Sequence, residues 1–236
     1  MKNLLILLVF LPSITNAQLK ELVKQITPKT VKSATTGLDI SAGLKEALNK
    51  GITKQVSKLT ATDGFYKNNA VKILMPAELQ KVDKALRAMG MGNLADEGIK
   101  SLNRAAEDAV NEATPIFVNS IKTMSITDAK TILMGNDTAA TSYLQKSTSS
   151  ALYTKFSPVV QQSIGKVGAD KIWASIITKY NKLPLVSKVN PDIADYVTNK
   201  AMEGVFKMIA VEEKSIRGNL SSRTSDLLKQ VFALQD

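Results

Sequence analysis

Apolar residues recur at three- and four-residue spacing along most of this chain of 236 residues. Such spacing gives each segment one apolar face when it is wound as a helix, and it does not fit the alternation expected of strands. Ala, Leu and Lys, which favour helices, are abundant. The sequence therefore predicts an all-α fold, with a single multi-helix globular domain of about eight to ten helices.

Helix start and stop signals divide this pattern. The expected helices span residues 18–26, 41–59, 76–89, 94–113, 115–124, 129–134, a segment carrying Tyr143 and Leu144, and residues 150–167, 170–180, 191–217 and 224–232. Pro76 and Pro115 suit the first turns of their helices. Ser125 and Asp128 resemble a capping box, and Asp137 is expected to cap the helix that follows Gly135.

A loop is expected over residues 62–75, around the Asp63-Gly64 turn, with a short extended piece at 71–74. Residues 18–38 are expected to form a short helix and a flexible, Thr- and Lys-rich lead-in that contains Pro28 and Gly37. No later stretch marks a domain boundary, so residues 39–236 are interpreted as one helical domain.

The first 17 residues have the pattern of a secretory signal peptide. Lys2 gives a short basic start, the apolar run 4–11 is too short to span a bilayer, and small residues lead to a cut after Ala17. The alternative is an uncleaved N-terminal membrane anchor. We expect export to the periplasm or outer envelope, with no transmembrane span after cleavage. Because the chain has no Cys, lipidation at the cut is excluded.

The composition excludes several kinds of active site. The chain contains no His and no Cys. It therefore lacks the residues for a Ser-His-Asp triad, an imidazole or structural zinc site, a thiolate nucleophile and an iron–sulfur cluster. No phosphate-binding glycine loop is present. We expect no bound metal, no cofactor and no catalytic residue set.

The formal net charge is +10, from 31 Lys and Arg against 21 Asp and Glu. In an exported protein, such a charge favours contact with anionic phospholipid, lipopolysaccharide or acidic wall polymers. Nucleic acid is a disfavoured partner in that compartment. The simpler interpretation is that the lysines are scattered for solubility.

Residues 41–59 predict a basic amphipathic helix. Its apolar residues fall within one arc of about 120° at 100° per residue, and three lysines fall opposite: Lys50, Lys54 and Lys58. These lysines are candidates for contact with an anionic surface. Simple packing on the core with a solvated lysine face is favoured, since the apolar side carries no Trp or Phe.

Two helices carry polar residues that invite a functional interpretation. In residues 101–110, Arg104 can pair with Glu107 and Asp108 on a polar face, which stays a plain exposed face unless another element covers it. In residues 191–217, Glu212 projects from the apolar face while Glu213 points elsewhere. Three interpretations of Glu212 are open: its side chain lies beyond the edge of the core, it pairs with a cation, or it has a function that needs a perturbed pKa.

Arg104 and Arg223 are the expected partners for Glu212. Phe206 projects from the polar side of the same helix and should cover a neighbouring segment or mark a contact surface. The candidate functional or buried polar residues are Asn103, Arg104, Glu107, Asp108, Glu212 and Arg223.

The chain resembles a known bacterial family in stretches that cover nearly all of the mature sequence in order. They are AGLKEAL (42–48), DGFYKNNAVKI (63–73), PAELQKVDKALRAMG (76–90), SLNRAAEDAV (101–110), DAKTIL with GNDTAAT (128–141), YNKLPLVSKVNPDIADYV (180–197), and EEKSIR with RTSDLLKQVF (212–232). The family is the one known as domain of unknown function 4197 (DUF4197). The resemblance implies an exported, mostly helical protein, often from Gram-negative bacteria, and implies no activity. It also implies that the six candidate polar residues belong to the family pattern.

The sequence thus predicts an exported envelope protein that binds or scaffolds, through lysine-rich faces, an anionic envelope component or another envelope protein. The alternative is a carboxylate-based hydrolase or divalent-metal enzyme acting on envelope material, with Glu107, Asp108 and Glu212 as acid, base or ligands. In a third interpretation, the basic amphipathic helix inserts into membranes.

Overall fold

The computed structural model describes residues 29–166, 192–223 and 225–233, together with 168, 170, 171, 174, 178, 181, 182, 184, 188 and 190. The predicted signal peptide, the predicted helix 18–26 and most of the predicted helix 170–180 lie outside these residues. The chain divides between Leu38 and Asp39 into two units. Of the first unit, residues 29–38 are described, and they are helical. The site discussed below belongs to the second unit.

The described residues are helical and contain no strand, which confirms the all-α prediction. The α-helices are α2 (Lys29–Thr60), α3 (Gln80–Ala88), α4 (Gly92–Val110), α5 (Ala113–Thr123), α6 (Ile126–Leu133), α7 (Ala139–Gly165), α9 (Ile193–Gly218) and α10 (Asp226–Phe232). Two short 3₁₀ turns, η1 (Ala77–Leu79) and η2 (Leu220–Ser222), precede α3 and follow α9.

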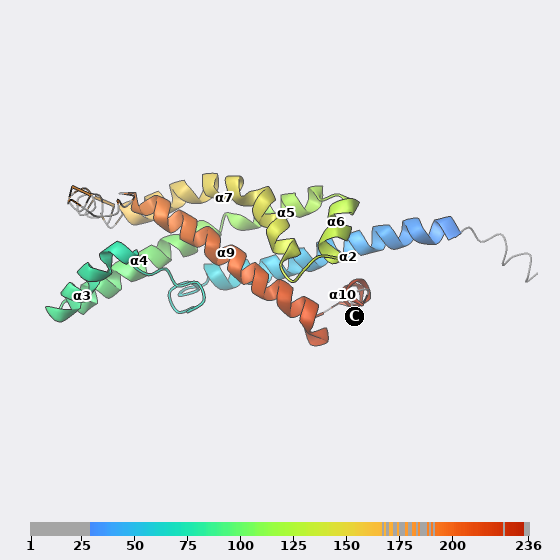
Figure 1. The fold of residues 1–236 in the computed structure, drawn as a ribbon, viewed down its shortest axis with the longest axis horizontal. Helices are drawn as coiled ribbons and strands as arrows, with labels where there is room; N and C mark the ends of the chain where they lie inside the picture. Colours follow the sequence, from blue (N-terminus) through green and yellow to red (C-terminus); the bar gives the residue numbers. More distant parts are fainter. Residues whose placement is uncertain are drawn as a thin grey trace, which may run out of the picture. The chain divides into compact units, whose positions relative to one another are not determined.

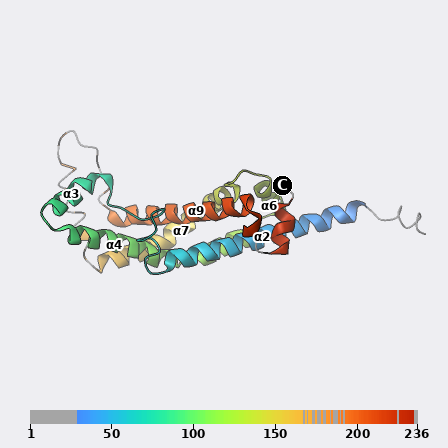
Figure 2. The same cartoon turned by 90° about the horizontal axis from the view of Figure 1, so that it is seen from below.

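Helices α4, α7 and α9 form the centre of the second unit. Helix α9 packs against α7 and α4, which also pack against each other, while α5 and α6 lie on α7, and α3 on α4 (Figure 1). Figure 2 shows α9 running alongside α4 and then α2. The contact with α2 is close at Gly51, where an added Cβ would lie 3.4 Å from the Glu212 side chain and 3.9 Å from Ile216.

One hydrophobic core joins these helices. Its largest fully buried side chains come from α2, the loop after it, α5, α6, α7 and α10: Leu44, Leu59, Phe65, Phe117, Ile121, Leu133, Leu144, Leu152, Phe156, Ile164 and Leu228. Phe206 is buried, and its ring meets Phe117 edge-on with centroids 6.0 Å apart. Phe206 therefore covers a neighbouring segment, the first of the two roles expected for it.

The helix boundaries differ most from the sequence prediction in two places. Helix α2 begins at Lys29 rather than at residue 41, and so includes Gly37. Helix α7 is one continuous helix through Pro158, where two helices were expected. It stays continuous because its buried residues recur every four positions on one side, from Leu144 through Leu152 and Phe156.

The turn before α7 corrects a further expectation. Asp137 does not cap the helix; the N-cap is Thr138, whose side chain makes no capping hydrogen bond. By contrast, the capping box at α6 is confirmed, because Ser125 accepts from the Asp128 N–H and Asp128 accepts from the Ser125 N–H. Among the described helices, none has the length and apolar character needed to cross a membrane.

The loop between α2 and η1, residues 61–76, is held closely against α2, α4 and α9. Asp63 adopts a left-handed conformation with φ 69°. At the next residue, a Cβ on Gly64 would lie 2.3 Å from the Lys58 carbonyl oxygen, so only glycine fits. This turn directs Phe65 into the core, where it is fully buried. The extended piece was predicted at residues 71–74; Val71 lies in a turn, and residues 72–76 continue without helix or turn.

Candidate functional site

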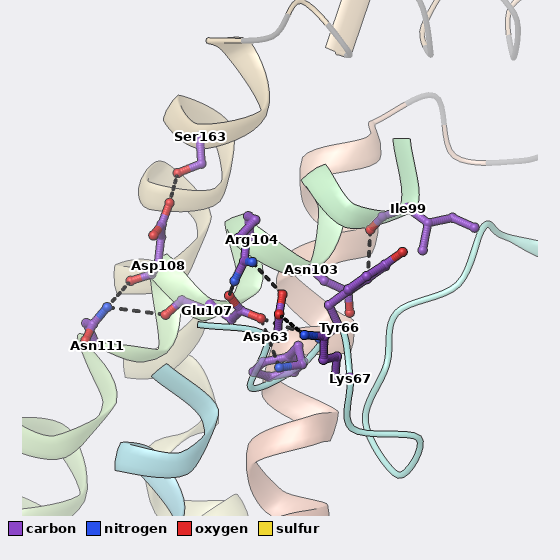
Figure 3. Close-up of polar contacts among 11 residues, drawn as sticks. Asp63, Tyr66, Lys67, Ile99, Asn103, Arg104, Glu107, Asp108, Asn111 and Ser163 are labelled. Atoms are coloured by element: carbon purple, nitrogen blue, oxygen red, sulfur yellow. Dashed lines mark hydrogen bonds and ion pairs between the residues drawn. The ribbon is translucent and has the colours of Figure 1, made fainter. Parts of the chain in front are cut away.

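Four polar side chains lie where α4 meets the loop 61–76, and we call them the α4 polar cluster: Asp63, Asn103, Arg104 and Glu107 (Figure 3). Asn103 is fully buried. Its carbonyl oxygen accepts from the Ile73 N–H at 2.8 Å, and its Nδ2 donates to the carbonyls of Ile73 at 2.8 Å and Ile99 at 2.7 Å. A single amide thus satisfies both backbone groups of Ile73, as a neighbouring strand would.

Glu107 performs the same task at the start of the loop. Its Oε1 accepts from the backbone N–H groups of Phe65 at 3.0 Å and Tyr66 at 3.4 Å. Its Oε2 accepts from the Arg104 guanidinium at 2.5 Å, and Arg104 also donates to Asp63 at 2.5 Å. The polar face of α4 is therefore covered by the loop, and its side chains fix that loop in place.

The charges of the cluster balance one another. Lys67 and Arg104 lie beside Asp63 and hold the pKa of its carboxyl below the usual range. Glu107, followed by Asp63, raises the pKa of Arg104. Each carboxylate thus faces a cation, and the lowered pKa keeps Asp63 ionised near neutral pH. An acid held in this way is a poor proton donor, which favours a structural role for the cluster.

Asp108 lies next to the cluster in sequence but faces another way. It is exposed, and it accepts from the Ser163 hydroxyl of α7 at 2.8 Å. Asp108, Ser163, Arg104 and Lys166 line an open groove of about 280 Å³ between α4 and the end of α7. Asp108 therefore belongs to the surface, whereas Glu107 belongs to the interior.

Glu212 is paired with a cation, which was one of the three alternatives. Its side chain is 13% exposed and accepts from Lys54 Nζ and Gln55 Nε2 of α2, each at 2.6 Å. The predicted partners, Arg104 and Arg223, were wrong, because the cation that Glu212 contacts is Lys54 of α2. Lys54 is the nearest cation once α2 packs along α9.

Glu213 is more buried than Glu212, contrary to the expectation that it points away from the core. It accepts from the N–H groups of Ala140 and Thr141, both at 2.9 Å, and so caps the start of α7. Arg217, one turn further along α9, donates to Glu213 at 2.9 Å and to the carbonyls of Ile132 and Leu133 at the end of α6. This Glu213–Arg217 pair joins three helices at their polar ends.

Arg223 is buried and acts at the end of α9. Its Nε donates to the Ile216 carbonyl at 3.1 Å and its Nη2 to the Arg217 carbonyl at 3.0 Å. The guanidinium carbon lies 5.7 Å from the centre of the Phe232 ring of α10. Arg223 therefore satisfies helix-end carbonyls and covers an aromatic ring, a structural arrangement for a buried cation.

The arrangement of α4, the loop and the C-terminal helices spans the same stretches that carried the resemblance noted above. A family model described as "Protein of unknown function (DUF4197)" matches residues 34–233, most of the chain. The chain belongs to the DUF4197 family. No curated protein and no solved structure matches it.

In this DUF4197 protein, the six candidate polar residues fall into separate places. Asn103, Arg104 and Glu107 belong to the α4 polar cluster, Asp108 lines the groove beside α7, Glu212 faces α2, and Arg223 ends α9. The two candidate acids that line grooves, Asp108 and Glu212, line different ones. Within the described part of the chain, no group of three acidic residues is placed to hold a metal ion.

The α2 lysines proposed for surface contact are exposed, but two of them are engaged. Lys50 pairs with Glu46 at 2.5 Å, and Lys54 pairs with Glu212 at 2.6 Å. Lys58 is also exposed, and no ion pair is recorded for it within the described residues. The α2 lysine face therefore carries less uncompensated charge than the sequence pattern indicates.

Three residues that organise this DUF4197 fold were not among the candidate site residues. They are Asp63, Glu213 and Arg217. The Asp63-Gly64 pair predicted the turn, in which Asp tolerates a left-handed backbone, but not the ion pairs of Asp63. Glu213 and Arg217 carried only the weak signal of their own four-residue spacing, since their backbone partners lie between 72 and 85 residues away along the chain.

Proposed function

We propose that this protein is an exported, non-catalytic binding module of the bacterial envelope, whose exposed lysines contact an anionic envelope component. The observation that carries the proposal is the exposure of lysines on three helices, whereas three of the glutamates serve the fold itself. Glu107 and Glu213 are buried, and Glu212 is nearly so, with each bonded to backbone N–H groups or to a polar side chain of the fold. Lysines on α2, α7 and α9 point to solvent: Lys54, Lys58, Lys146, Lys155, Lys207 and Lys214.

The exposed lysines belong to a chain with an excess of basic residues. The whole chain carries a formal net charge of +10. The inward-facing glutamates Glu107, Glu212 and Glu213 each pair with a cation of their own, which is Lys54 in the case of Glu212, so they leave the charge of the other exposed lysines available to a partner. A surface of this kind attracts anionic headgroups or wall polymers at a distance of about one Debye length, roughly 8 Å at physiological salt.

The enzyme alternative depends on carboxylates that are free to exchange protons or bind metal. Glu107 accepts two backbone N–H groups and a guanidinium, and Glu212 accepts an ammonium and an amide. Asp108 is the accessible acid of the three, and it is bonded to Ser163. These contacts favour the binding proposal over the alternative.

Fractionation and sedimentation test the proposal together. The full chain is expressed in a Gram-negative host, and the processed protein is purified from the envelope compartment. Its first residue should be Gln18, established by mass. Co-sedimentation with anionic vesicles, neutral vesicles and peptidoglycan is then measured at low salt and at about 0.15 M salt. We expect binding to an anionic fraction that weakens as salt rises.

Retention of the chain in the cytoplasm would reject the exported role. Absence of binding to every envelope fraction would reject the binding role and would leave the charge as a solubility feature. Replacing Lys50, Lys54 and Lys58 by Gln tests the insertion of α2 separately, because unchanged vesicle binding would reject that helix as the contact.

A further inference from the structure

A groove of about 290 Å³ lies between the loop segment 70–74 and α9, and the α2 lysines are not part of its lining. Its lining includes Lys72 from the loop and Tyr196, Lys200, Glu203 and Lys207 from α9. We call the three lysines of the groove beside α9 the α9 groove lysines: Lys72, Lys200 and Lys207.

The groove is built on fixed backbone. Asn103 holds both backbone groups of Ile73 from beneath, and the Tyr196 hydroxyl donates to the Leu74 carbonyl at 3.1 Å. A Cβ on Gly204 would lie 2.7 Å from the Phe65 ring and 3.3 Å from Val71, so the loop and α9 are in direct contact there. The spacing between the loop lysine and the helix lysines is therefore set before any ligand arrives.

The groove carries a net positive charge. Lys200 pairs with Glu203 at 2.6 Å, with both side chains well exposed. Within the described part of the chain, neither Lys72 nor Lys207 has an ion pair; Lys72 instead lies 4.2 Å from the centre of the Tyr66 ring. The groove lining thus holds three ammonium groups and one carboxylate, and Asp96, outside the lining, attracts Lys72 from a distance. Lysine binds phosphate as a point charge.

The positive charge continues along α9. Lys200, Lys207 and Lys214 follow one another at seven-residue intervals. At 100° and 1.5 Å per residue they fall within an arc of about 40° and lie roughly 10 Å apart along the helix. Glu212, which holds Lys54 of α2, lies about 140° away from Lys207 around α9, so the α2 lysines belong to a different side of this helix.

Apolar surface lies beside the charge. Leu74 is 54% exposed at the edge of the groove, although it belongs to the otherwise well-held segment. Tyr196, which bonds the Leu74 carbonyl, is half-buried, and so is Tyr66, whose ring lies against Lys72. Lysines beside tyrosines and an exposed leucine match the boundary of a bilayer, where phosphate meets hydrocarbon. A soluble phosphate ester carries no acyl chain that would cover the exposed leucine.

We propose that this groove binds the phosphate headgroup of an anionic phospholipid at a membrane surface, with the α9 groove lysines on the phosphate and Leu74 at the acyl boundary. The inference rests on the proposed envelope-binding function and names its ligand class and its contact site. It replaces the α2 lysines as the principal contact.

Vesicle partitioning of the processed protein tests the site. The variant K72Q/K200Q/K207Q is compared with the matched control K50Q/K54Q/K58Q, which removes the same charge from α2. The probes are vesicles of phosphatidylglycerol and of phosphatidylcholine, at about 0.15 M salt. A lysine close to an anionic surface is worth roughly fivefold in partitioning. We therefore expect a drop on the order of a hundredfold for the groove variant and less than about fivefold for the control.

Two further arms make the outcome specific. Leu74→Ser should weaken partitioning several-fold while leaving the charge unchanged, and excess glycerol 3-phosphate should not displace the protein from vesicles. Circular dichroism and urea unfolding of each variant establish that the fold is intact.

The results separate this inference from the function on which it rests. Equal losses in the two lysine variants would overturn the groove, because only net charge would matter. Binding to peptidoglycan or lipopolysaccharide but not to phospholipid would overturn it while the envelope-binding function stands. Full displacement by glycerol 3-phosphate would assign the groove to a soluble ester. Absence of binding by the unaltered protein to any fraction would reject both proposals.

Discussion

At the scale of single residues, the buried polar side chains of this protein act on backbone rather than on a ligand. Asn103 is the clearest case, because its amide pairs with both the N–H and the C=O of Ile73. An extended segment without a neighbouring strand would otherwise leave these groups unpaired in the interior. The same logic applies to Glu107 and the N–H groups of Phe65 and Tyr66.

Replacing Asn103 with Leu should lower the free energy of unfolding by about 3 kcal/mol, because it leaves two buried backbone groups without partners. Urea denaturation measures the change. Asn199→Leu is the control, since Asn199 is exposed and bonds only within α9, to Asp195. That variant should stay within about 0.5 kcal/mol of the unaltered protein. Equal effects from both would contradict the role given to Asn103.

Asp63 gives a prediction for pH. Its pKa is lowered in the folded protein, chiefly by Lys67 and then by Arg104. The stabilisation it provides is therefore present above the unfolded pKa of about 3.9 and is lost as pH falls through the folded value. Asn tolerates the positive φ of this position, so Asp63→Asn isolates the charge.

The stability advantage of the unaltered protein over Asp63→Asn should accordingly shrink as pH falls from about 5 toward 2. Urea midpoints across this range measure it. A difference that is constant with pH would mean that the ion pairs of Asp63 do not stabilise the fold.

At the scale of the helices, the Glu213–Arg217 pair decides how α6, α7 and α9 meet. Both side chains are almost fully buried, at 5% and 6% exposure. Removing one charge from a buried pair costs about 3 kcal/mol or more. Glu213→Gln should therefore destabilise the protein by about that amount. Glu203→Gln breaks the exposed pair with Lys200 on the same helix, and it should cost less than about 1 kcal/mol.

Two glycines in helices should respond in opposite directions to alanine. At Gly204 the new methyl group would lie 2.7 Å from Phe65, so Gly204→Ala should destabilise by about 1–3 kcal/mol. At Gly165, the last residue of α7, nothing lies within 4 Å of the new atom. Gly165→Ala should stabilise by up to about 1 kcal/mol. Thermal unfolding compares them, and stabilisation by both would show that α9 and the loop are not tightly packed at Gly204.

The sequence predicts the helices better than their contacts, and the caps show why. The Ser125–Asp128 box spans three residues, so its partners are visible in the sequence. The cap of α7 comes from Glu213, some 70 residues later, and no local pattern reveals it. Glu212 stands out in the sequence because it interrupts an apolar stripe. Its partner Lys54 lies on a helix far away along the chain, so no local pattern identifies it.

At the scale of the whole molecule, one core joins α2, the loop, α4 to α7, α9 and α10 within residues 39–236. The absence of cysteines leaves this core to packing and buried polar bonds alone. The all-α class can be predicted from the periodicity of apolar residues. The position of the loop that crosses α4 cannot, because it depends on Asn103 and Glu107 binding backbone groups far away along the chain.

A single shared core predicts one cooperative unfolding transition for the second unit. Urea unfolding followed by far-UV circular dichroism, which reports helices, should coincide with near-UV circular dichroism, which reports packed aromatic rings such as Phe117 and Phe206. Two separate midpoints would mean that part of the helical domain folds by itself.

The Glu213–Arg217 pair has a consequence for how such proteins can diversify. Because α9 holds the carbonyl end of α6 and the amide end of α7, the corner between them does not have to set the direction of either helix. Asp137 is exposed and does not cap α7, whereas Asn136 accepts from the Thr138 N–H and so shapes the turn. Asp137 also lines an open groove of about 670 Å³ with Lys214. Substitutions at Asp137 can therefore change the chemistry of the groove while the scaffold beneath it stays as it is.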